Sequence, residues 1–117
     1  MMPQARTPDG ASTDSSEITP TELFTVFAHE RRQLALAYLS HRGTAISIGD
    51  LAEYIAVTEG DPTYEWYERI VTDLHHSHLP QMCDLGIVDY DVESERISLT
   101  VDTGIVTPYL DLAGHIV

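Results

Sequence analysis

Lysine is absent from this chain of 117 residues, and all six of its basic residues are arginine. Against them stand 19 aspartates and glutamates, spread along every segment, which give a formal net charge of −13. Dispersed carboxylates suit molar salt, where the Debye length falls to roughly 3 Å and self-repulsion is screened. We therefore expect a protein of a halophilic cytoplasm; an acidic protein from a low-salt organism is the alternative.

Cysteine and long apolar runs are also scarce. The single cysteine, Cys83, excludes an internal disulfide and a zinc site built from cysteine pairs. No apolar run approaches the roughly 18 residues of a membrane span, and the first residues lack the apolar core of a signal peptide. We therefore expect a cytoplasmic protein with no membrane partner.

The length suits one domain with an arm and a tail. Residues 1–18 are rich in Ser, Thr, Pro, Asp and Gly without apolar periodicity, which predicts a disordered acidic and polar arm. Residues 19–102 form the predicted domain. Residues 103–117 are apolar, and we expect a short helix there that packs on the domain or across a homodimer. The candidate dimer contacts are Tyr109, Leu110 and Leu112.

The domain begins with two predicted helices. Thr19 followed by Glu22 is the pattern of a capping box, and Pro20 suits the first helical position because its missing N–H costs nothing there. A second helix is predicted from about Glu30, with Gly43 as its stop. Both segments carry apolar residues at helical spacing, which predicts that they pack on one core.

Two further helices follow. Ser47 repeats the capping signal and starts a third helix, and a longer helix begins at about Tyr64. Pro80 lacks a backbone donor and clashes with the carbonyl four residues before it. The long helix therefore either kinks there, or ends near His78 and restarts to run to Leu85.

A β-hairpin is predicted after the long helix. The segments "IVDYD" and "RISLT" alternate apolar and polar residues and are joined by the short turn "VESE"; "TAIS" is a further short strand candidate. The order is helix, helix, strand, helix, longer helix and hairpin. It predicts a mainly α fold with a small β-hairpin wing (α+β), a winged helix-turn-helix, with the helix of about residues 64–78 in the DNA major groove.

Three segments resemble a known family. "LFTVFAHERRQLALAYL" is similar to the opening of archaeal ArsR-type winged helices, "SIGDLAEYIA" to their first helix-turn-helix helix, and "LHHSHLPQMCDLGIVDYD" to the passage into the wing. The sequence His78-Leu79-Pro80 resembles a group of small acidic winged-helix proteins of halophilic archaea, mostly of unassigned function. The resemblance covers residues 23–100 and implies the fold and DNA binding. It implies no metal sensing, because the cysteine pair of the metal sensors is absent.

Four residues of metal-binding type lie close together, namely His75, His76, His78 and Cys83. On one helix His76 points about 100° away from His75, so the histidines do not converge on one ion, and Cys83 lies beyond the break at Pro80. We expect no metal and no cofactor. Instead, His75 and His78 should be half-buried and capped by backbone carbonyls, with Cys83 as a packing residue. No nucleophile, base and orienting group lie together, so no enzyme is expected.

The outward face of the long helix holds the candidate DNA contacts. They are Arg69, Thr72, His76 and Ser77, opposite the apolar stripe. Arginine binds guanine or phosphate, and hydroxyl and imidazole groups bind phosphates or base edges. Arg96 is the candidate contact in the wing, although Asp91, Glu93 and Glu95 argue against DNA there. Asp73 lies among the helix contacts, where a carboxylate either accepts from cytosine or is simply solvated.

Arg31 and Arg32 open the second helix, where positive charge opposes the helix dipole. This placement indicates either a phosphate contact or pairing with Glu22 or with an acidic group of a partner. The leading hypothesis is a dimeric, DNA-binding transcriptional regulator of a halophilic archaeon. The main alternative is a winged helix that contacts only other proteins, and a third is a sensor with a histidine-bound metal.

Overall fold

The computed structural model describes residues 18–114, so most of the predicted arm and residues 115–117 of the predicted tail lie outside the described part. The helices are α1 (Pro20–Phe27), α2 (Glu30–Arg42), α3 (Ile48–Thr58), α4 (Tyr64–Asp73), α5 (Leu79–Asp84) and α6 (Thr103–Leu112), with the π-helical turn η2 (Leu74–His78) between α4 and α5. The strands are β2 (Ile46–Ser47), β3 (Val88–Asp91) and β4 (Arg96–Leu99).

Side-chain caps start the helices where the sequence predicts them. Thr19 and Glu22 form both hydrogen bonds of the capping box, with Pro20 at the first helical position of α1. The Ser47 hydroxyl accepts from the Asp50 N–H at 3.0 Å and starts α3. Both caps satisfy N–H groups that have no partner inside the helix, so the predicted helix starts are confirmed.

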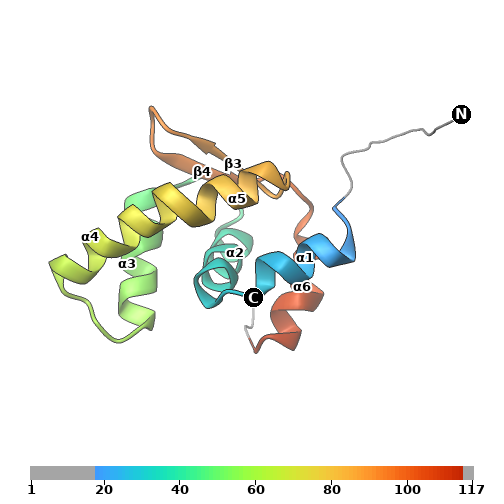
Figure 1. Cartoon of the computed structure of the whole chain (residues 1–117), viewed down its shortest axis with the longest axis horizontal. Coiled ribbons are helices and arrows are strands. Elements are labelled where there is room, and N and C mark those ends of the chain that lie inside the picture. Colours follow the sequence, from blue (N-terminus) through green and yellow to red (C-terminus); the bar gives the residue numbers. More distant parts are fainter. Residues whose placement is uncertain (1–17, 115–117) are drawn as a thin grey trace, which may run out of the picture.

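The long helix continues through Pro80 without leaving helical conformation, and Figure 1 shows α4 and α5 in one line that crosses α3 and passes above α2. The η2 turn makes this possible. Within it the Leu79 N–H donates to the carbonyl five residues back, on Leu74. The wider turn adds one residue before the proline, so the proline ring avoids the carbonyl that an α-helix would place against it. The predicted break near His78 is therefore a local widening, and the helix ends at Asp84.

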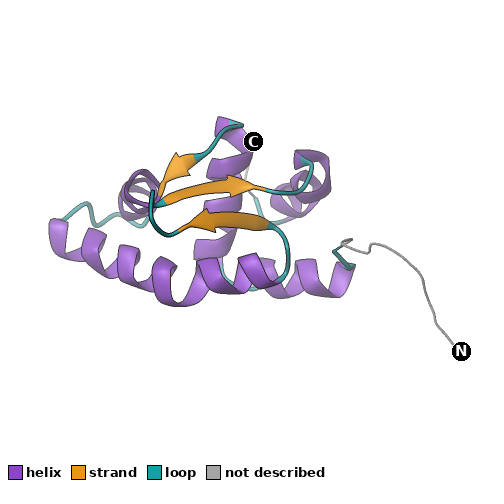
Figure 2. Ribbon diagram, turned by 90° about the horizontal axis from the view of Figure 1, so that it is seen from above, coloured by secondary structure: helices purple, strands orange, loops and turns teal. Residues whose placement is uncertain are grey.

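The strands form a small antiparallel sheet in the order β2-β4-β3. Ile97 of β4 lies opposite Ile46 of β2 on one side and Tyr90 of β3 on the other. Figure 2 shows the three strands side by side, with the long helix running along the sheet. The predicted hairpin and the short strand before α3 are confirmed.

The core lies between the long helix, α2, α3 and the sheet. Ile70, Leu74, Leu79 and Met82 are fully buried, which confirms the inward stripe of the long helix. They belong to one cluster with the buried leucines and isoleucines of α2, α3 and the sheet. A winged helix of the α+β class, mainly helical with a β-hairpin wing, is thus the fold of this chain.

The last helix, α6, packs on the domain itself, against α1 and α2. The Tyr109 ring stacks on Phe27 at 5.5 Å and meets Phe24 edge-on at 5.6 Å. Leu110 is fully buried and serves the core of its own chain, whereas Leu112 is 84% exposed. Of the three candidate dimer contacts, Leu112 is therefore the most available to a partner, and the homodimer stays a prediction.

Among residues 18–114, no helix combines the length and the apolar character that crossing a bilayer demands.

The stop of α2 gives a prediction on stability. Gly43 has a φ of 69°, in the left-handed region, and nothing lies within 4 Å of the position that a Cβ would take. Gly43→Ala should therefore lower the free energy of unfolding by about 1 kcal/mol through backbone strain alone. Chemical denaturation in molar KCl measures the change.

Gly104→Ala is the matched control, because a Cβ there would meet only Asp102 Oδ1, at an ordinary 3.6 Å. Gly104→Ala should therefore not lower the free energy of unfolding. An equal loss at the two glycines would contradict the role of the left-handed conformation.

Candidate nucleic-acid interface

The outward face of α4 and η2 carries the predicted helix contacts. Ile70 and Leu74 point into the core, which turns the residues between and beyond them outward. The predicted contacts are all exposed, and all of them line one open, shallow hollow of about 520 Å³: Arg69, Thr72, His76 and Ser77. The structure therefore brings these four residues together on one surface.

Arg69 differs from the other described arginines in having no partner. Arg31 pairs with carboxylates, and Arg42 donates to a tyrosine hydroxyl. Arg32 and Arg96 donate to backbone carbonyls. Within residues 18–114, the Arg69 guanidinium makes neither a hydrogen bond nor an ion pair. Its five N–H donors are thus available to a ligand that accepts in a fork geometry.

The side chains beside Arg69 in the hollow are polar, and Thr72 already makes a hydrogen bond within the protein. The Thr72 hydroxyl donates to the Glu68 carbonyl at 3.0 Å and keeps its lone pairs for an external donor. Glu68 and Trp66 also line the hollow. The surface therefore offers one free cation, an imidazole and two hydroxyls, with an acidic group at its margin.

Arg96, the predicted contact in the wing, is not part of this hollow. It lies on β4 opposite Asp91 and donates to the Ala45 carbonyl at 2.8 Å. This bond ties the hairpin to the segment before β2. Around it, Asp91, Glu93 and Glu95 are exposed, so the surface of the wing is acidic.

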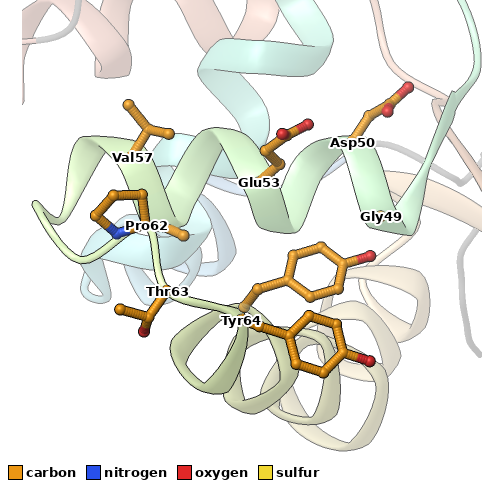
Figure 3. Close-up of a pocket in the computed structure, with 9 residues that line it drawn as sticks. Gly49, Asp50, Glu53, Val57, Pro62, Thr63 and Tyr64 are labelled. Atoms are coloured by element: carbon orange, nitrogen blue, oxygen red, sulfur yellow. The ribbon is translucent and has the colours of Figure 1, made fainter.

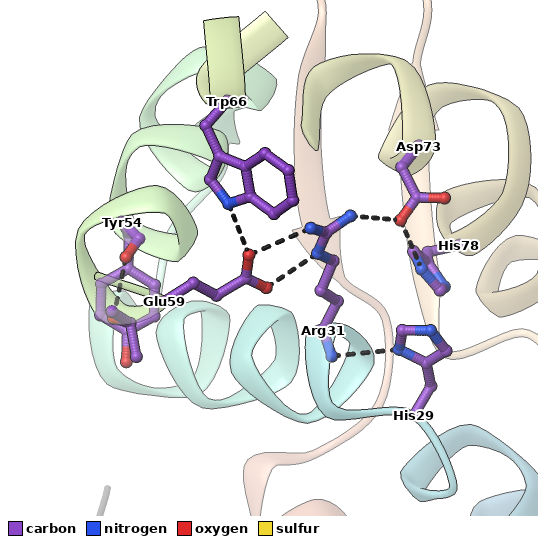
Figure 4. A network of polar contacts seen from close by, with 8 residues as sticks. His29, Arg31, Tyr54, Glu59, Trp66, Asp73 and His78 are labelled. Carbon is purple, nitrogen blue, oxygen red and sulfur yellow. Dashed lines mark hydrogen bonds and ion pairs between the residues drawn. The ribbon is translucent and has the colours of Figure 1, made fainter. Parts of the chain in front are cut away.

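A network of ion pairs forms one wall of the hollow and joins the helices (Figure 4). Arg31 donates to the Glu59 carboxylate at 2.8 and 3.0 Å and to Asp73 Oδ2 at 2.8 Å. Trp66 Nε1 donates to Glu59 at 2.8 Å, and the Trp66 ring lies 5.5 Å from the Arg31 guanidinium. One arginine of α2 thereby joins the end of α3 to the middle of the long helix.

His78 extends this network into the core, and the exposed His29 packs against it. Nε2 of His78, whose side chain is 5% exposed, lies 2.9 Å from Asp73 Oδ2, and neither ring nitrogen of His78 has a well-directed hydrogen bond to any residue between 18 and 114. The His29 ring packs edge-on against His78 at 4.2 Å. His29 Nδ1 also accepts from the Arg31 N–H at 3.2 Å and so caps α2. His78 is therefore a buried imidazole in a charged surrounding.

The pKa values of the network follow from its geometry. The hydrogen bond from Arg31 lowers the pKa of Glu59, and burial opposes the shift. Burial would raise the pKa of Asp73, but Arg31 and His78 outweigh it and lower the pKa. Burial lowers the pKa of His78, more than Asp73 raises it. The network therefore favours two carboxylates, one guanidinium and a neutral imidazole.

The ring nitrogens of His75 and His78 have other neighbours than the sequence predicts. His75 Nδ1 is 3.0 Å from the Tyr90 hydroxyl, and His78 lies beside a carboxylate. The prediction that backbone carbonyls cap both rings is therefore wrong: the nearest polar partner is a side chain in each case, the Tyr90 hydroxyl for His75 and the Asp73 carboxylate for His78. Cys83 is half-buried, and burial raises the pKa of its thiol, as suits a packing residue. In the described part, no three histidine, cysteine or acidic residues are grouped to hold a metal.

The pairing of Arg31 and the role of Asp73 are the features that sequence reasoning missed. The partners of Arg31 are Glu59 and Asp73 rather than Glu22, and Asp73 turns toward the network instead of being a plain solvated group. Arg32 donates to the Thr25 carbonyl at 3.2 Å. These partners lie 28 and 42 residues from Arg31, so no local pattern could have revealed them.

Removal of Arg31 should destabilise the domain. In Arg31→Met, Glu59 and Asp73 lose their cation and the two helices lose their link, so we expect a loss of about 1–2 kcal/mol in the free energy of unfolding. Arg69→Met is the matched control, because it removes the same charge from an exposed side chain without a partner and should stay within about 0.5 kcal/mol. Denaturant titration of both variants in molar KCl decides; equal losses would contradict the network.

His78 should make stability depend on pH. Its pKa is lowered from 6.5 in the folded protein, so below that pH the unfolded chain binds more protons and the free energy of unfolding falls as the pH falls. The carboxylates of the network, with lowered pKa values, act at lower pH. Thermal melting between about pH 7 and 5 should show a shallower slope for His78→Gln than for the wild type. Identical slopes for His78→Gln and the wild type would contradict the prediction.

Comparison with known proteins places the chain in a family. No curated protein and no solved structure matches the chain. Residues 24–98 match the profile of a family described as a domain of unknown function. The match runs from α1 to β4 and contains the hollow, the ion-pair network and the wing. The chain therefore belongs to the DUF7344 family of domains of unknown function.

Proposed function

We propose that the protein is a DNA-binding transcriptional regulator of a halophilic archaeon, acting in the cytoplasm with α4 and η2 in the major groove. The observation that carries the proposal is the free Arg69 on the exposed face of the long helix. In a chain with 19 carboxylates, an arginine without a partner among residues 18–114 is available for a task outside its own chain. A helix of this kind fits the width of the major groove.

The other groups of the hollow have roles that suit this task. Arg69 would donate both ends of its guanidinium to O6 and N7 of guanine, the commonest specific contact of arginine. Ser77 and His76 would bond phosphate oxygens or base edges, with Thr72 as an acceptor. Arg31 and its carboxylates would keep the helix at a fixed angle to the domain during binding.

High salt reconciles this task with the net charge of −13. The affinity for B-DNA falls with a logarithmic salt slope of about −0.9 per phosphate neutralised. A protein that uses one or two cations therefore loses little affinity in molar salt, where the Debye length of roughly 3 Å also screens its own acidic surface. Binding would then depend on direct hydrogen bonds and shape rather than on counterion release.

A homodimer belongs to the proposal, with half-sites about one helical turn apart. The exposed Leu112 on α6 and the exposed Phe24 on α1 supply apolar surface for it, at 84% and 62% exposure. Apolar side chains that gather into a large exposed patch usually mark a surface that a partner covers.

The acidic wing supports a second function, a module that binds a basic protein partner. Val92 at the tip is 60% exposed, and exposed carboxylates flank it at Asp91, Glu93 and Glu95. An apolar tip within negative charge complements a basic surface rather than a phosphate backbone. In this function the hollow at Arg69 would contact no DNA.

A selection experiment distinguishes the two functions. Genomic fragments are captured on the immobilised full-length protein in molar KCl, and the affinity for selected duplexes is measured by fluorescence anisotropy. We expect sequence-selective binding, weakened roughly 5- to 150-fold by Arg69→Ala, because a bidentate contact to guanine contributes about 1–3 kcal/mol.

Arg42→Ala is the control, since it removes an equal charge from the exposed end of α2, outside the hollow. It should change the affinity by less than about twofold. Failure to enrich any sequence, at high or low salt, would contradict DNA binding and favour the protein-binding module.

A further inference from the structure

A second hollow lies between α3 and the start of α4, on a different surface from the hollow at Arg69. It has a volume of about 540 Å³, within the range of small-molecule sites. Figure 3 shows Asp50, Glu53 and Val57 along α3, with Tyr64 across from them on the first turn of α4. Pro62 and Thr63 close one end.

The charge of this hollow is negative and unpaired. The carboxylates of Asp50 and Glu53 are exposed and form no ion pair or hydrogen bond with any described residue. No arginine or histidine is among the residues that line the hollow. A positively charged occupant would therefore meet two free carboxylates and no competing cation of the protein.

The opposite wall is aromatic. Tyr64 and Tyr67 stack with their ring centroids 6.0 Å apart and their planes 27° from parallel, and Tyr64 is 75% exposed. The Tyr67 hydroxyl lies 2.9 Å from the point that a Cβ on Gly49 would occupy, so the glycine admits the tyrosine against the start of α3. The ring faces carry negative charge density that attracts cations.

We propose that this hollow binds a small organic cation, an alkylated ammonium that contacts the tyrosine rings with its methyl groups and the two carboxylates with its charge. Both kinds of contact are needed in molar salt. Potassium reaches the carboxylates as a compact hydrated ion, but it has no apolar shell to place against Val57, Pro62 and the rings. An alkylated ammonium has that shell, and so the walls distinguish it from the salt.

The proposal does not depend on DNA binding. It rests on the hollow, its aromatic wall and its unpaired carboxylates, none of which belongs to the surface at Arg69. The plainer explanation is that Asp50 and Glu53 are solvated surface carboxylates and that the hollow is empty. The proposal requires saturable binding that depends on the positive charge of the ligand and not on its shape alone. The plainer explanation predicts no saturable binding.

Choline chloride is the probe, added to the full-length protein in molar KCl and followed by ¹H–¹⁵N NMR. We expect saturable chemical-shift changes in the millimolar range, confined to residues 48–67. The neutral alcohol 3,3-dimethylbutan-1-ol has the same shape without the charge, and it should cause much weaker changes. Glu53→Gln and Tyr64→Leu should each weaken choline binding about threefold to tenfold.

Glu93→Gln is the matched control, because it removes the same charge from the wing and should leave choline binding unchanged. Both test positions are exposed, so the variants are expected to fold, and the dispersion of their spectra shows whether they do. Absence of saturable shifts would overturn the proposal. So would equal binding of the neutral alcohol, or an equal loss in Glu93→Gln.

Discussion

The ion pairs of Arg31 decide how the long helix lies on the domain. One guanidinium joins α2 to Glu59 at the end of α3 and to Asp73 in α4, with all three donor distances between 2.8 and 3.0 Å. The buried apolar stripe of the long helix sets which side of the helix faces the core, and the bidentate arginine adds a contact that accepts few geometries. The outward direction of this face of α4 therefore follows from the buried stripe at Ile70 and Leu74, and Arg31 reinforces it.

Local signals predict most of the fold, and distant contacts decide the rest. The caps at Thr19 and Ser47 and the apolar spacing of the long helix act within one or two turns, so they can be read from the sequence. The same spacing predicts that Arg69 faces outward. The partners of Arg31 cannot be predicted this way, because 19 carboxylates offer many equivalent choices until the chain is folded.

The η2 turn shows where a simple rule on proline is incomplete. An α-helix cannot accept Pro80 without a kink or an end, because of the clash with the carbonyl four residues back. One wider turn removes the clash and keeps the helix direction. It also places Leu74, His78 and Leu79 on the buried side of the helix, so His78 lies beside Asp73 from within the core. The position of the buried imidazole is thus a consequence of how the helix accommodates its proline.

The same network explains why Arg69 has no partner among residues 18–114. Asp73 lies four residues after Arg69 on the same helix, at the spacing where opposite charges pair. Yet Asp73 Oδ2 is already 2.8 Å from Arg31 and 2.9 Å from His78, so this carboxylate is engaged by other partners although it lines the same hollow as Arg69. With no lysine and few arginines, the described part of that face has one guanidinium without a partner, that of Arg69. Loss of Arg31 would release Asp73 to neutralise it, so the internal ion pairs and the exposed surface are linked through a single carboxylate.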